Sequence, residues 1–273
     1  AAGDAARASL MWELSARANG GVYGLRRAES TSNGVRRLVL SRMIAEDELS
    51  RGEAAQAVKT VQAAFRLSAP PLWGVRDLDP LVLRAITDEL ERWDVLTQDE
   101  AMLALELTRG EALARVGQLD EARRALTGVQ QKLETKSGGA TGALWLRLAR
   151  VWASFAVESL GDPAQAVRAC DLARARAGAE GIARSTQAVA FLRAEQAAHA
   201  RGGDAARARS LADELIALAR QRGDAREECV SWSSRAALHF RDGALHVARN
   251  GFEKSLELAR RIGFRRREAM ALH

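Results

Sequence analysis

Apolar residues recur along most of the chain in Ala- and Leu-rich runs with helical spacing, and short polar breaks separate the runs. The pattern predicts a series of amphipathic α-helices, and no sustained strand-like alternation is present. A glycine lies in many of the breaks, and an alanine follows it five positions later. These pairs are Gly3/Ala8, Gly52/Ala57, Gly117/Ala122, Gly161/Ala166, Gly203/Ala208 and Gly243/Ala248. Such self-similarity is typical of helical repeats, in which helix pairs bury their faces by stacking on their neighbours.

The repeat unit predicts close contact between the two helices of each pair. The residue seven positions before the glycine is small in Ala45, Gly110, Ser154 and Ala236, whereas Gln196 is the exception. A small residue facing the recurring alanine lets two backbones approach closely. We expect each glycine to end the first helix in the left-handed conformation. The Asp, Glu or Gln that usually follows would begin the second helix near its positive end.

The last unit resembles the tetratricopeptide repeat (TPR) family, because Trp232, Ala236, Gly243, Ala248 and Phe252 stand at that family's spacing. The later turn glycines are 44, 42 and 40 residues apart, longer than the usual period of about 34. Longer units with the run Leu-Ala-Arg-Gln-Arg-Gly-Asp, at 218–224, resemble the sensor arrays of large bacterial signalling proteins. The resemblance implies an all-α fold: a right-handed α-solenoid of antiparallel helix pairs, or TPR-like superhelix.

Three regions are expected. Residues 1–68 should hold N-terminal TPR-like units with a Gly-rich loop at 19–35, and residues 69–98 a Pro-containing linker with an odd helix. Residues 99–273 should form regular TPR-like repeats, with a loop near 136–142 and an end inside a further repeat. We therefore interpret the sequence as a piece of a larger protein.

Composition narrows the possible surroundings and partners. The chain is 47% hydrophobic and 28% charged, which favours a soluble protein without a membrane span. The net charge of +6 comes from 41 basic and 35 acidic residues that are interspersed, so we expect no nucleic-acid partner. Cys170 and Cys229 fall in helical patterns and are interpreted as core thiols of a reducing compartment. No secretory leader is evident, which favours a cytoplasmic location.

No residue pattern indicates catalysis, a cofactor or a metal. His239 and His246 flank the Gly243 turn, but no third ligand stands nearby in the sequence. A phosphate-binding glycine loop and a nucleophile elbow are both missing from the sequence. The basic run at 260–267 favours an exposed turn over a patch for phosphate or an acidic partner. We therefore expect a non-enzymatic chain.

The resemblance implies a concave wall formed by the first helices, and a binding function would lie there. For Trp152 and Phe155 the alternative is a place in the core between repeats, and for the arginines it is simple solvation. The wall residues expected to bind a protein or peptide are Arg42, Glu46, Glu111, Arg115, Trp152, Phe155, Arg193, Arg201, Phe240 and Arg241.

The leading hypothesis is a protein- or peptide-binding sensor or scaffold module of a larger bacterial signalling protein. Arginine and aromatic side chains are enriched among the residues that dominate binding energy, which fits this wall. Two alternatives remain open. The chain is the regulatory arm of a parent kinase, protease or signalling ATPase, or it is a structural scaffold that self-associates.

Overall fold

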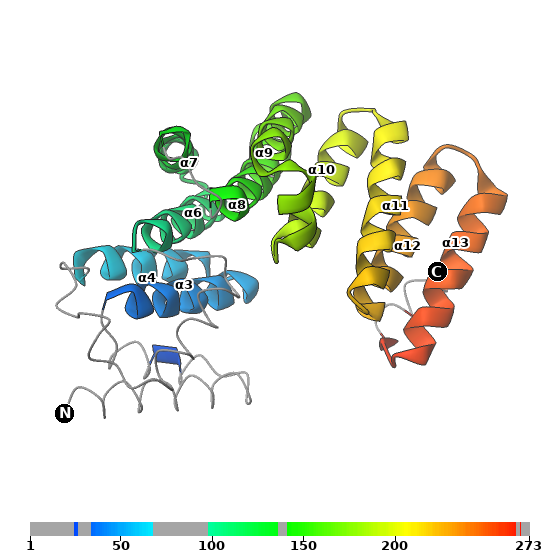
Figure 1. Ribbon diagram of the computed structural model, residues 1–273, viewed down its shortest axis with the longest axis horizontal. Helices are drawn as coiled ribbons and strands as arrows, with labels where there is room; N and C mark the ends of the chain where they lie inside the picture. Colours follow the sequence, from blue (N-terminus) through cyan, green and yellow to red (C-terminus); the bar gives the residue numbers. More distant parts are fainter. Residues whose placement is uncertain (1–24, 27–33, 68–97, 136–140, 266–267, 269–273) are drawn as a thin grey trace. The chain divides into compact units, whose positions relative to one another are not determined.

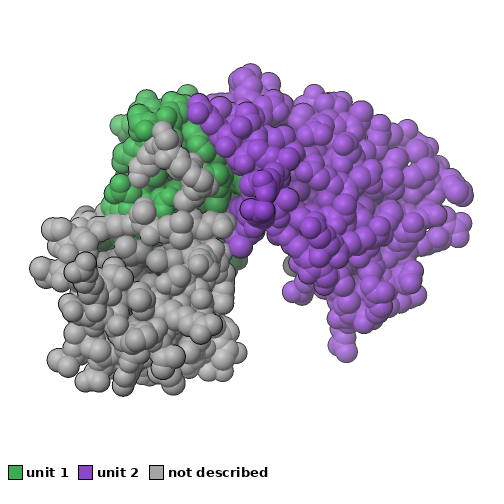
Figure 2. Space-filling view, viewed as in Figure 1, with its two compact units in different colours: residues 1–151 green, residues 152–273 purple. Residues whose placement is uncertain are grey.

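The computed structural model describes residues 25–26, 34–67, 98–135, 141–265 and 268. All regular secondary structure within these residues is helical, which confirms the all-α prediction. The chain divides into two compact units, residues 1–151 and 152–273 (Figure 2). The Gly3 turn, nearly all of the 19–35 loop, the linker helix in 69–97 and the end of the last repeat lie outside the described residues.

The first unit contains helices α3 (Gly34–Ser50), α4 (Ala54–Leu67), α6 (Gln98–Val116) and α7 (Leu119–Glu134). It also holds residues 141–151 of α8 (Thr141–Ser154), which includes the last two residues of the loop expected at 136–142. Helix α3 packs on α4 and α6, and α6 packs on α7. Their shared core is made of large aliphatic side chains, including Leu38, Ile44, Leu105, Leu113 and Leu126.

The second unit begins with the end of α8 and a short π-helix, η2 (Phe155–Leu160). Five helices follow: α9 (Pro163–Arg184), α10 (Ala188–Arg201), α11 (Ala205–Gln221), α12 (Ala225–Arg241) and α13 (Leu245–Arg261). Each of them packs on the next along the chain, and Figure 1 shows α9 to α13 side by side. Because the connections are short, neighbours run antiparallel. This is the expected stacking of helix pairs in a TPR-like solenoid.

The turn glycines have the predicted left-handed conformation. Their φ values lie between 65° and 87° at Gly52, Gly117, Gly161, Gly203 and Gly243. The alanines five positions later are all buried, with at most 2% of their surface exposed. Together these features confirm the repeat unit that the sequence predicts.

Small residues bring α12 and α13 into close contact, as expected. A Cβ atom added to Gly251 would lie 2.9 Å from the Cβ of Ala236 and 3.4 Å from its Cα. Gly251, which the sequence analysis did not single out, therefore lets the two backbones meet. In the first unit, a Cβ on Gly110 would lie 2.7 Å from Cδ2 of Leu126.

Helix α9 has a break that the sequence analysis missed. Gly178 has φ 68° and ψ 165°, values that are not helical, so residues 179–184 form a separate last turn set at an angle to the rest of the helix. Only glycine adopts this combination easily. The extra turn lengthens this unit of the repeat.

Replacing Gly251 with alanine should destabilise the protein. Alanine favours a helix interior by about 0.5–1 kcal/mol over glycine, but the clash with Ala236 should cost about 1–3 kcal/mol because that atom is fixed to the backbone. Gly128 of α7 is the matched control, because a Cβ there would meet nothing within 4 Å. Urea unfolding should show Gly251→Ala less stable and Gly128→Ala more stable than the wild type. Equal stabilisation by both substitutions would contradict the close helix contact.

Candidate partner-binding site

The residues expected on the concave wall lie on the first helices of successive pairs. Their positions are α3 for Arg42 and Glu46, α6 for Glu111 and Arg115, α8 and η2 for Trp152 and Phe155, α10 for Arg193 and Arg201, and α12 for Phe240 and Arg241. They belong to both units. By their burial and their ion pairs these residues fall into three groups.

Three of these residues are buried. Arg42 exposes 2% of its surface, Trp152 7% and Phe155 2%. The rings of Trp152 and Phe155 are 5.6 Å apart and tilted by 55°, a contact between two core side chains. Their burial favours the alternative of a core role. Positions counted back from Gly161 pass through η2, where i→i+5 hydrogen bonds change which residues share a face.

A second group holds neighbouring helices of the first unit together. Arg150 of α8 donates to Glu111 of α6 at 2.8 Å, and Arg115 donates to the same carboxylate at 2.8 Å. Arg147 of α8 pairs with Glu46 of α3. The sequence analysis found the two glutamates and missed Arg147 and Arg150, because nothing in the local pattern shows which helix an arginine will reach.

The environment of Glu111 lowers the pKa of its carboxyl group below the ordinary value. Burial alone would raise this pKa, but the positive charge and hydrogen bond of Arg150 act against it, and Arg115 and Arg147 add to the lowering. The carboxylate therefore stays ionised at neutral pH as the centre of an ion-pair cluster. Glu111 is 13% exposed, so little of it is available to a partner.

Arg193 has a similar structural role in the second unit. Its guanidinium donates to both carboxylate oxygens of Glu227 on α12, at 2.9 and 2.6 Å. The Ser231 hydroxyl donates to the same carboxylate at 3.0 Å. A paired guanidinium of this kind links the first helices of two successive pairs. A partner could bind Arg193 only in competition with Glu227.

The third group is exposed and lies where α10 and α12 end. Phe240, near the end of α12, exposes 62% of its surface, and Leu245, the first residue of α13, exposes 61%. Arg241 donates to the carbonyl oxygen of Ala200 at 3.3 Å, which places the end of α12 beside that of α10. Arg201 has no hydrogen-bond or ion-pair partner among the described residues. We define the distal patch as Arg201, Phe240, Arg241 and Leu245.

The turn beside the distal patch lacks the side-chain helix cap that three other turns have, as does the turn at Gln118 before α7. Asp162, Asp204 and Asp224 each accept a backbone N–H three residues later, at 2.9 Å. Ala244 occupies the same position before α13 and offers no side-chain cap. An alanine there costs about 1 kcal/mol relative to a capping residue. Ala244 therefore leaves the start of α13 without a side-chain cap, at the expense of local helix stability.

One trio of possible metal ligands stands close together among the described residues. Oxygen or nitrogen atoms of Asp171, Glu195 and His199 lie within 4.8 Å of one another. However, Glu195 already accepts hydrogen bonds from Arg174 at 2.5 and 3.1 Å and from Arg207 at 3.2 Å. A divalent cation would have to displace these guanidinium groups, so this donor set fits an ion-pair network better than a metal.

Comparison with known proteins identifies the fold. No protein-family model and no curated protein sequence matches the chain. Among solved structures, a STAND protein with a tetratricopeptide repeat sensor from Pyrococcus horikoshii matches with TM-score 0.64 and 14% identity, over 91% of this chain and 33% of that one.

Two further solved structures are similar to this chain. The nearly identical TPR-like repeats of a candidate kinesin light chain from Podosopora anserina match with TM-score 0.57 and 16% identity, over 83% of this chain and 96% of that one. BtubC from P. vanneervenii matches with TM-score 0.58 and 12% identity, over 96% of this chain and 91% of that one. At these identities the likeness shows the fold. None of the described helices has the length and apolarity needed to cross a membrane.

Replacing Glu111 with glutamine should reduce stability at neutral pH and matter less in acid. The folded pKa of Glu111 is lowered, so its contribution is complete above the unfolded pKa of about 4.3 and is lost as the pH falls through the folded pKa. We expect a loss of about 1–3 kcal/mol at pH 7. Urea unfolding of wild type and Glu111→Gln between neutral and acid pH measures this. Glu257→Gln, which replaces an exposed carboxylate on α13, is the control. A stability difference between wild type and Glu111→Gln that does not shrink in acid would contradict the lowered pKa of Glu111.

Proposed function

Because the chain has the tetratricopeptide-like repeat fold, we propose that it is a non-enzymatic module that binds a protein or peptide through the distal patch. The observation that carries the proposal is the exposure of Phe240 and Leu245 on either side of a turn without a side-chain helix cap. A solvent-exposed phenylalanine gains most from being covered by a partner. The proposal includes no cofactor, nucleic acid or membrane.

The chemistry of the distal patch favours an acidic peptide with an aromatic or aliphatic side chain. Phe240 and Leu245 offer apolar surface for that side chain, and Arg201 offers an unpaired guanidinium for a carboxylate. Arg241 is held by one hydrogen bond at 3.3 Å and retains other donors. The net charge of +6 also favours approach of an acidic partner.

A second candidate is that the module is the sensor or regulatory arm of a larger, cytoplasmic bacterial signalling protein. The likeness to the repeat sensor of a STAND protein, of which the match covers 33%, supports this candidate. In that case residues 1–68, 69–98 and 99–273 would form its N-terminal units, linker and regular repeats. The gene sequence on either side tests it: catalytic or nucleotide-binding motifs there would support the regulatory arm.

A third candidate is a scaffold in which the distal patch pairs with a second copy. Light scattering separates the cases, because self-association through the patch gives a dimer mass that falls to the monomer mass in Phe240→Ala. A monomer that binds the acidic peptide supports the leading proposal instead.

Phe240→Ala should weaken binding of a fluorescent acidic peptide that contains Phe and Leu by about tenfold or more, measured by fluorescence anisotropy. Arg201→Glu should weaken the same binding and reduce its dependence on salt. Val116→Ala is the matched control, because Val116 is also an exposed apolar residue beside a turn glycine, at 42% exposure.

The proposal makes a clear distinction between peptides. A basic peptide with the same apolar residues should bind more weakly than the acidic one. Unchanged affinity in both Phe240→Ala and Arg201→Glu, with the fold intact by circular dichroism, would exclude the distal patch as the binding site.

A further inference from the structure

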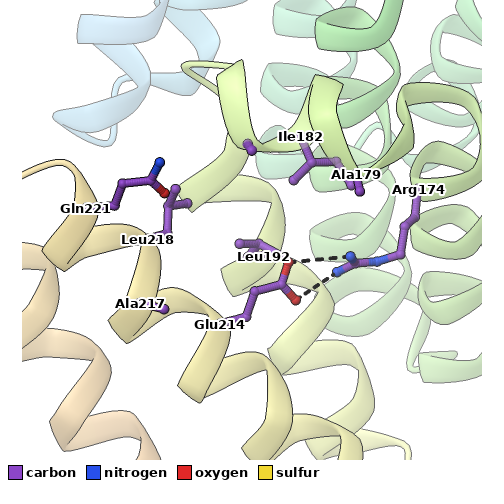
Figure 3. Close-up of a pocket in the computed structure, with 9 residues that line it drawn as sticks. Arg174, Ala179, Ile182, Leu192, Glu214, Ala217, Leu218 and Gln221 are labelled. Atoms are coloured by element: carbon purple, nitrogen blue, oxygen red, sulfur yellow. Dashed lines mark hydrogen bonds and ion pairs between the residues drawn. The ribbon is translucent and has the colours of Figure 1, made fainter.

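The extra turn of α9 borders a half-open cavity of about 210 Å³ in the second unit (Figure 3). Its walls are aliphatic: Ile182 from the extra turn, Leu192 from α10 and Leu218 from α11. Arg174 and Glu214 stand together at one end of the cavity. The cavity therefore combines an apolar passage with a charged end, an arrangement that suits an amphipathic side chain.

Hydrogen bonds hold the extra turn in place, so the cavity that it borders has a defined shape. The kink at Gly178 redirects the chain across α10 and α11. Arg222, just after α11, donates hydrogen bonds to the carbonyl oxygens of Ala183 and Ser185, at 3.0 and 2.8 Å. Ser185 in turn accepts the backbone N–H of Gln187 at 3.1 Å, which ties the segment to the start of α10.

The charged end has spare capacity for a cation and little for an anion. Arg174 donates to both oxygens of Glu195, at 3.1 and 2.5 Å, and its other edge faces Glu214 at 3.4 to 3.5 Å. An anion would have to displace one of these carboxylates. Glu214 is different, because its contacts are long and 40% of its side chain is exposed. One carboxylate oxygen accepts several hydrogen bonds, so an added donor can bind beside Arg174.

We propose that this cavity binds a lysine side chain of a partner polypeptide, with the alkyl chain along Ile182, Leu192 and Leu218 and the ammonium group on Glu214. Lysine fits better than arginine, because a compact ammonium group can bind to one free side of the Glu214 carboxylate. A guanidinium binds best through the paired oxygen face that Arg174 already occupies. The cavity shares no residue with the distal patch, so either proposal can fail while the other holds.

The test uses the full chain and three small probes that differ in charge. N-acetyl-lysine-N-methylamide carries the ammonium, its Nε-acetylated form has nearly the same shape without the charge, and N-acetyl-glutamate-N-methylamide carries the opposite charge. NMR titration should give a millimolar dissociation constant for the lysine probe, as a ligand of this size allows. The two other probes should bind about tenfold more weakly or not at all.

Two variants test the site from different sides. Glu214→Gln removes the proposed acceptor and should weaken lysine-probe binding about tenfold. Ala217→Leu, at an exposed lining position, fills the cavity and should abolish binding while Glu214 is kept. Glu257→Gln removes an exposed carboxylate elsewhere and should bind like the wild type.

Several results would overturn the proposal. They are equal or tighter binding of the glutamate or acetylated probe, unchanged affinity in Glu214→Gln, and no binding of the lysine probe at millimolar concentration. If Glu214→Gln proves unfolded by circular dichroism, Ala217→Leu decides: retained binding in that variant would exclude the cavity, and lost binding with an intact fold would support it.

Discussion

Close contact between helices through small side chains is the constraint on which the rest of this structure depends. The recurring alanines are buried, and the Ala236 and Gly251 backbones meet with no room for another methyl group. Helices this close leave few ways to cross. Variation is then restricted to the turns, to the ends of helices and to inserted segments, and both proposed binding features lie in such places.

Ion pairs add a second layer of contact above this packing. Arginine accounts for most of the basic residues, since only Lys59, Lys132, Lys136 and Lys254 are lysines. Much of this arginine spans neighbouring helices: Arg193 reaches Glu227, and Arg174 joins Glu195 to Glu214. A long side chain with a planar, forked end suits this role, because it can bridge helices whose backbones do not touch. These arginines therefore help to align successive repeats. This structural role differs from both roles considered from the sequence, simple solvation and ligand binding.

The repeat could be predicted from sequence because its determinants are local. A glycine with positive φ and a buried alanine at a fixed distance are properties of a single turn, and five described turns have them as expected. The candidate site was harder to predict. The wall positions counted back from Gly161 assume a regular α-helix, but the chain there forms the π-helix η2. The arginines of α8 that pair with Glu46 and Glu111 are distant in sequence from both glutamates. Whether a side chain is buried or ion-paired depends on tertiary contacts, which the spacing of residues along one helix does not reveal. Arg201 and Phe240, by contrast, are exposed at helix ends where few tertiary contacts can interfere.

Where one turn differs from the other turns of the repeat without gaining stability, the difference indicates a role other than folding. Ala244 stands where Asp162 and Asp204 cap their helices, and Phe240 and Leu245 on either side of the same turn are exposed to water. Each change is unfavourable for the isolated chain: the first loses about 1 kcal/mol of capping, and the second leaves apolar surface uncovered. The turn before α7 also lacks a side-chain cap, at Gln118, and exposes 42% of Val116, so the Gly243 turn is distinguished by the larger exposure of Phe240 and Leu245, at 62% and 61%. A bound partner that covers the apolar side chains on either side of this turn would offset their exposure, which is why the distal patch is the proposed binding surface.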